Sequence, residues 1–140
     1  MERTFLVLGA LFGFIGVALG AFGSHAVRSK LPPERVATFE TGVRYQLWHA
    51  LALFAVVFVG SLRLSPRSSS PSHELTLLED SLQWPAWVAG WLFVAGIVLF
   101  SGSLYALALS GRRRWGAVTP IGGVCLLLGW LALALEAWVA

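Results

Sequence analysis

Five polar side chains that could carry chemistry fall within ten residues of this 140-residue chain, at the start of an apolar stretch. They are Glu40, Arg44, Tyr45, Gln46 and His49. A carboxylate, a guanidinium and an imidazole can hold a ligand, transfer a proton or bond to one another. Ionisable groups beside lipid are costly and indicate a functional site by default. These residue types predict either a ligand site or a structural set of internal bonds.

The spacing of these residues separates them on a helix. Glu40 and Arg44 are four residues apart with the acid first, which favours an ion pair on one helical face. His49 is nine residues beyond Glu40, about half a turn around the helix, so it lies on another face. The start of such a helix is polar nearly all round, and we expect protein rather than lipid to surround it.

The elements that must position these groups are long apolar runs. Hydrophobic residues make up 57% of the chain and charged residues 12%, whereas a soluble domain has roughly 25% charged residues. We predict one all-α membrane domain of four transmembrane helices in an antiparallel up-down bundle. The predicted spans are about 4–26, 38–62, 84–110 and 116–139. A flexible Ser/Pro-rich loop is expected over 63–83.

Two of these spans leave alternatives open. The first run has the outline of a signal peptide, but its length and its glycines favour a retained span. The second span has an ambiguous start. Pro33 suits the first position of a helix, so a helix that begins there would lie at the interface and enter the membrane after Gly42, with or without a kink at that glycine.

Small residues form a stripe along the first span. Glycines recur there in steps of four and three, on one helical face, and such a stripe lets another helix backbone approach closely. We expect this face to pack against a second copy of the chain or a larger membrane complex. The predicted packing positions are Gly9, Gly13, Gly16, Gly20 and Gly23.

Basic residues beside the spans predict the topology. Seven lie in or beside the first and third connections: Arg28, Lys30, Arg35, Arg44, Arg112, Arg113 and Arg114. Three lie on the other side: Arg3, Arg63 and Arg67. The positive-inside rule then places both termini on the outer side of a bacterial inner membrane. The expected partner is the lipid bilayer, and the net charge of +3 does not indicate nucleic acid because the charges flank apolar runs.

This topology gathers the polar groups of all four spans in the cytoplasmic half of the membrane. Glu136 is the exception, near the outer end of the fourth span. We predict a candidate polar pocket in the cytoplasmic half. The structural alternative is that Glu40 and Arg44 form an ion pair, that His25 caps a helix end, and that His49 is a buried, hydrogen-bonded histidine. The candidate pocket residues are His25, Glu40, Arg44, Tyr45, Gln46, His49, Ser101, Ser103, Tyr105 and Thr119.

Motifs for catalysis are missing from the sequence. There is no Gly-rich phosphate loop, HExxH or CxxC motif, and the single cysteine, Cys125, forms neither an intrachain disulfide nor a thiolate metal site. We expect no cofactor, no metal and no catalytic residue. The favoured function is a non-enzymatic packing or accessory component of a membrane assembly. The alternative is a small transporter or a ligand- or lipid-binding protein. An enzyme acting on lipid headgroups is a third hypothesis.

Four segments occur in a fixed order along the chain. They are GAFGSHA at 20–26, FETGVRYQ at 39–46 followed by HAL at 49–51, LFSGSLY at 99–105 and TPIGG at 119–123. In this order they resemble the signatures of the DUF423 family of small membrane proteins. Ser24, Leu47 and Trp48 depart from the residues usual there. The resemblance implies a four-span inner-membrane protein, with relatives in mitochondria, and implies no particular activity.

Overall fold

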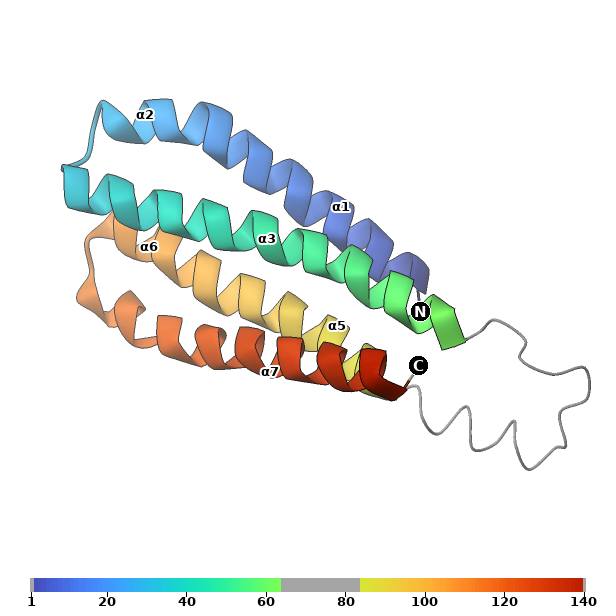
Figure 1. The fold of residues 1–140 in the computed structure, drawn as a ribbon. Coiled ribbons are helices and arrows are strands. Elements are labelled where there is room, and N and C mark those ends of the chain that lie inside the picture. The colour runs from blue at the N-terminus through green and yellow to red at the C-terminus, as the bar shows by residue number, and fades with distance from the viewer. Residues whose placement is uncertain (1, 64–83, 140) are drawn as a thin grey trace, which may run out of the picture.

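The computed structural model describes residues 2–63 and 84–139, and these residues are built from helices (Figure 1). Four stretches are long and apolar enough to cross a membrane: residues 3–28, 33–62, 85–110 and 113–138. The prediction of an all-α protein with four candidate spans is confirmed. The elements in chain order are α1 (Glu2–Ala18), η1 (Leu19–Gly23), α2 (Ser24–Arg28), α3 (Pro33–Arg63), α5 (Trp84–Gly96), η2 (Ile97–Ser101), α6 (Gly102–Ser110), η3 (Arg113–Ala117) and α7 (Thr119–Val139).

The first span packs along α3. A methyl group placed on Gly9 would lie 3.1 Å from the Ala50 carbonyl oxygen, and one placed on Gly23 would lie 3.0 Å from the Phe39 ring. Later residues of the first span contact earlier residues of α3, so the first span and α3 run in opposite directions. Gly16 and Gly20 contact α3 in the same way, whereas Gly13 meets nothing within 4 Å. Most of the glycine stripe is therefore covered by a helix of its own chain.

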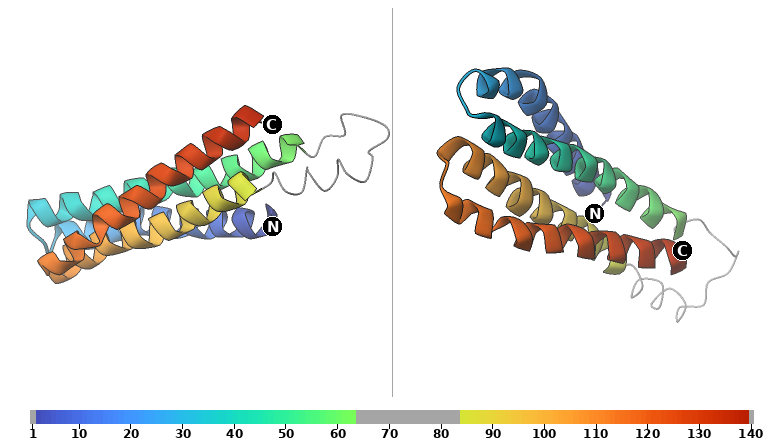
Figure 2. Two further views of the ribbon diagram at one scale, coloured as in Figure 1. Left: turned by 90° about the horizontal axis from the view of Figure 1, so that it is seen from below. Right: turned by 60° about the vertical axis from the view of Figure 1, so that its left-hand side comes forward.

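The third and fourth spans form the other close pair. A methyl group on Gly96 would meet the side chain of Leu126, and one on Gly129 would lie 2.8 Å from Phe93. In Figure 1 the two termini lie at one end of the bundle, and the α2–α3 and α6–α7 connections lie at the other. The left view of Figure 2 shows the same separation of ends. We call the end that holds the two connections the connection end.

Apolar side chains fill the bundle in two clusters. The larger joins all four spans toward the end that holds the termini, and includes the fully buried Leu53 and Phe93. The smaller lies toward the connection end and includes Phe39, Val43 and Ala108. Gln46 and His49, described below, lie on α3 between the residues of these two clusters.

Helix α3 is continuous from Pro33 to Arg63, through Gly42. At 1.5 Å per residue its 31 residues are about 46 Å long, which matches a bilayer of roughly 40–45 Å with its headgroups. Of the two possible starts of the second span, the structure has the helix that begins at Pro33, without a break at Gly42. The predicted flexible loop lies almost wholly in residues 64–83, outside the described residues.

Two spans each contain a single π-helical turn, a feature that was not predicted from the sequence. η1 interrupts the first span and η2 interrupts the third. A π-helical turn holds one residue more than an α-helical turn, so side chains beyond it are rotated by about 100° relative to an unbroken α-helix. Each turn overlaps a segment that carried the family resemblance. The η1 turn sets the direction in which α2 presents Arg28.

Candidate functional site

Gln46 connects three helices in the interior of the bundle. Its Nε2 donates a hydrogen bond of 2.8 Å to the Phe12 carbonyl of α1. Its Oε1 accepts a hydrogen bond of 2.9 Å from the Tyr105 hydroxyl of α6. The side-chain amide of Gln46 is buried, so both ends of the amide are paired within the protein. This arrangement bonds α1 to α6 through α3.

His49 is also bonded at both ring nitrogens. Nδ1 lies 2.7 Å from the Tyr45 carbonyl, one helical turn earlier, and Nε2 lies 3.2 Å from Nε1 of Trp130 in α7. An indole N–H only donates, so Nε2 accepts and Nδ1 carries the proton. Phe93 completes the surroundings, 5.7 Å away between ring centroids. This geometry fits a neutral imidazole with no free nitrogen.

Hydroxyl groups connect α6 to the start of α7. Ser103 Oγ lies 2.9 Å from the Phe100 carbonyl and 2.8 Å from Thr119 Oγ1. Ser101, two residues earlier in η2, is 1% exposed. Its hydroxyl has no hydrogen-bond partner among the residues that the structure describes. Of the predicted serines, one therefore bonds two spans together and the other does not.

The predicted ion pair between Glu40 and Arg44 is wrong. Glu40 instead accepts from Arg28 of α2, at 3.1 Å from Nε and 2.7 Å from Nη2, both to Oε1. Arg44 is exposed and has no ion pair within the described part of the chain. An exposed ion pair between residues four apart on a helix is weak. The Arg28 guanidinium of α2 instead places two donors on Oε1 of Glu40. His25 is exposed as well.

The predicted pocket residues thus fall into separate groups. One group forms hydrogen bonds in the interior and consists of Gln46, Tyr105, His49 and Tyr45. A second group is the hydrogen-bonded pair of Ser103 and Thr119. Ser101 is buried in η2. Glu40 faces a groove at the connection end, and His25 and Arg44 lie on the surface. Within residues 2–63 and 84–139, no group of three or more His, Cys, Asp or Glu side chains is placed to hold a metal ion.

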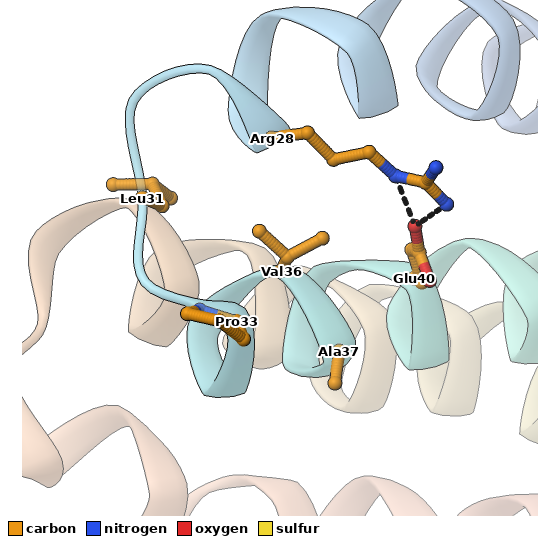
Figure 3. Close-up of a pocket in the computed structure, with 6 residues that line it drawn as sticks. All are labelled: Arg28, Leu31, Pro33, Val36, Ala37 and Glu40. Carbon is orange, nitrogen blue, oxygen red and sulfur yellow. Dashed lines mark hydrogen bonds and ion pairs between the residues drawn. The ribbon is translucent and has the colours of Figure 1, made fainter.

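The groove lies where α2 leads into α3. It has a volume of about 300 Å³ and is open rather than enclosed. Figure 3 shows the Arg28 side chain bonded to Glu40 on one side of the groove, Leu31 on the turn between α2 and α3, and Val36 between the turn and Glu40. Its lining residues are Arg28, Leu31, Pro33, Val36, Ala37 and Glu40.

Three further residues hold this arrangement together and were not among the predicted site residues, although Arg28 and Arg35 were named from the sequence for their charge. Arg28 and Trp130 have partners 12 and 81 residues away, so no local spacing indicates them. Arg35 donates from Nε to the Ala108 carbonyl at 2.6 Å, one of the last carbonyls of α6. Gly111 follows that helix with φ of 70°, the left-handed ending that favours glycine. A glycine after an apolar run was the available signal for this helix end.

Four apolar spans, with several polar side chains bonded to one another inside the bundle, define an integral membrane protein. The chain matches the family described as "Protein of unknown function (DUF423)" over residues 19–123, and it belongs to that family. All four segments that carried the resemblance fall within or largely within this match, so the resemblance is confirmed.

Relatives cover nearly the whole chain. It is 38% identical to the UPF0382 membrane protein YwdK of Bacillus subtilis, over 96% of each chain. It is 38% identical to the UPF0382 inner membrane protein YgdD of Escherichia coli, over 97% of this chain and 90% of the relative. A UPF0382 membrane protein of Staphylococcus saprophyticus is 39% identical over 95% of each chain. No solved structure matches. The names of these relatives give a membrane location and no activity.

Proposed function

We propose that this protein is a non-enzymatic, multi-pass component of the bacterial inner membrane whose buried polar side chains lock the helices into one rigid bundle. The observation that carries the proposal is the pairing of Gln46 and His49. Each bonds through both of its polar ends to other helices or to backbone carbonyls. A general base needs a free lone pair within reach of a substrate, and His49 has none.

The same pairing argues against a transport site at this depth. Transporter sites use unwound backbone and polar groups that exchange partners with the cargo, whereas Gln46 and Tyr105 bond to each other. The glycine stripe, which suggested a partner chain, mostly contacts α3. The stripe therefore gives no support for association with a second copy or a larger complex, and the partner in the proposed function is the lipid bilayer.

The structural role predicts how His49 and Trp130 respond to substitution. His49→Phe alone leaves the Trp130 N–H without its acceptor, and we expect a loss of about 1 kcal/mol in the free energy of unfolding. The double variant His49→Phe/Trp130→Phe removes both partners and is expected to recover most of that loss. Thermal unfolding of the purified protein in mild detergent measures both effects.

The same preparations separate a structural from a ligand-binding role. Mass spectrometry of molecules that co-purify should give the same set for the wild-type protein and the double variant. The proposal would be contradicted if the double variant kept its stability but lost a small molecule that co-purifies with the wild-type protein.

The membrane orientation is a second part of the proposal. At the connection end, Arg28, Lys30 and Arg35 gather with Arg112–Arg114, and the positive-inside rule favours the cytoplasm for that end. Both termini would then face the outer side.

A reporter enzyme that is active only outside the cytoplasm tests this orientation. Fused after Ala140, it should be active, and fused within residues 111–114 of a truncated chain it should be inactive. The reverse pattern would refute the proposed orientation. Replacing Arg112–Arg114 with glutamine should lower the activity difference, because these residues supply much of the charge asymmetry.

A further inference from the structure

The groove between α2 and α3 pairs one cation and one anion against an apolar wall. Arg28 and Glu40 form its charged side, and Leu31, Pro33 and Val36 form most of its apolar side (Figure 3). Its volume of about 300 Å³ is at the lower end of the range for small-ligand sites. We propose that this groove binds the zwitterionic headgroup of a phospholipid with a primary ammonium, such as phosphatidylethanolamine.

The depth of the groove in the membrane suits a headgroup. Glu40 is seven residues after Pro33, so it lies about 10 Å along α3 from its first residue. The headgroup region of one leaflet is roughly 5–7 Å thick. A helix that matches the full bilayer therefore carries Glu40 near the boundary between headgroups and hydrocarbon. A lipid in that leaflet reaches the groove without leaving the membrane.

The ion pair in the groove leaves bonding capacity on both partners. Both Arg28 donors converge on Oε1 of Glu40. Oε2 of Glu40 and Nη1 of Arg28 have no partner among the described residues. The Arg28 and Glu40 side chains are 65% and 32% exposed, and exposed pairs of this kind contribute little to stability. Either group is thus open to a further charged partner.

Charge complementarity selects the type of headgroup. A purely anionic headgroup would meet the repulsion of Glu40, and a purely cationic ligand would meet that of Arg28. A phosphate beside an ammonium satisfies both, because guanidinium binds phosphate oxygens and carboxylate accepts from an ammonium N–H. A quaternary ammonium has no N–H to donate, so a choline headgroup lacks the bond to Glu40. The apolar wall would contact the glycerol and the first methylene groups.

This inference goes beyond the proposed structural role and does not depend on it, because the groove lies apart from the bonds of Gln46 and His49. The full chain is purified in mild detergent. It is then offered equal amounts of phosphatidylethanolamine, phosphatidylcholine and phosphatidylglycerol with identical acyl chains. Native mass spectrometry counts the lipids retained. We expect phosphatidylethanolamine to be retained at least fivefold over each of the other two.

Three variants assign the binding to the groove. Glu40→Gln should abolish the preference for phosphatidylethanolamine over phosphatidylcholine, and Arg28→Gln should lower retention of phosphatidylethanolamine at least fivefold. Val36→Trp, which fills the groove and keeps both charges, should also lower retention of phosphatidylethanolamine at least fivefold. Arg44→Gln is the matched control, since it removes an exposed arginine of α3 that does not line the groove.

Circular dichroism verifies that each variant remains helical, and Val36→Trp keeps the test decisive if a charge variant unfolds. Equal retention of the three lipids by the wild-type protein would overturn the proposal. So would phosphatidylethanolamine binding that survives both Arg28→Gln and Val36→Trp. A preference for phosphatidylglycerol that Glu40→Gln leaves unchanged would indicate a general cationic surface and would equally refute it.

Discussion

Replacing Gly122 with alanine is expected to lower the free energy of unfolding by about 3 kcal/mol. A Cβ at this position would overlap the Phe100 backbone nitrogen and lie 2.7 Å from the Phe100 Cα. Backbone atoms cannot rotate away as a side chain can, so α7 would have to move off η2. That movement would also strain the contact between Ser103 and Thr119, which joins the same two spans. Thermal unfolding in mild detergent should show a drop of about 10 °C.

The neighbouring residue supplies the control for this substitution. A Cβ on Gly123 would lie 3.7 Å from the Phe100 ring, which is ordinary van der Waals contact. Alanine also has a higher helix propensity than glycine, so Gly123→Ala should be neutral or slightly stabilising. Equal melting temperatures for the two variants would show that α7 and η2 do not approach as closely as described.

Replacing Gln46 with leucine is expected to cost about 2 kcal/mol, the second large effect. The substitution removes both hydrogen bonds of the amide and leaves the Tyr105 hydroxyl without its acceptor in a half-buried position. Hydrogen bonds between helices in membranes are each modest, but an unpaired polar group inside the bundle adds a desolvation cost. Helices α1 and α6 would lose the side chain that connects them through α3.

A double-mutant cycle measures the bond directly. Tyr105→Phe removes the hydroxyl with little change in shape, and the coupling between Gln46→Leu and Tyr105→Phe should be about 1 kcal/mol. Thr38→Val is a suitable control, because that hydroxyl bonds to the Glu34 carbonyl of its own helix. A coupling near zero would mean that Gln46 and Tyr105 are bonded to other groups in solution.

The architecture was predictable because lipid is a demanding solvent. A long apolar run with few charges has to satisfy its backbone internally, and a helix is the available single-span solution. Gly9, Gly16, Gly20 and Gly23 each face α3, and their spacing follows the helical repeat that predicted a common face. The identity of the facing helix was not predictable, because spacing describes a face and not its partner.

The sequence indicates many of the polar residues that the candidate site contains, but not which of them bond to one another. The crowded polar groups from Glu40 to His49 lie in a segment that makes several bonds between helices. The partner of Glu40 was predicted wrongly, because reasoning along one helix considers residues four positions away. The guanidinium of Arg28 comes from another helix, and η1 turns it toward α3. No local pattern in the sequence indicates such a π-helical turn.

Composition and periodicity by themselves determined that this chain is helical and has four apolar spans, whereas the resemblance to the DUF423 family came from four ordered sequence segments. These properties depend on the residue types within each segment and on the cost of exposing polar groups to hydrocarbon. Only the tertiary structure decided that His49 bonds to Trp130, that Gln46 bonds to Tyr105 and that Glu40 pairs with Arg28. Each of these bonds depends on distances of about 3 Å between helices, which follow from the packing and rotation of whole spans and leave no regular spacing in the sequence.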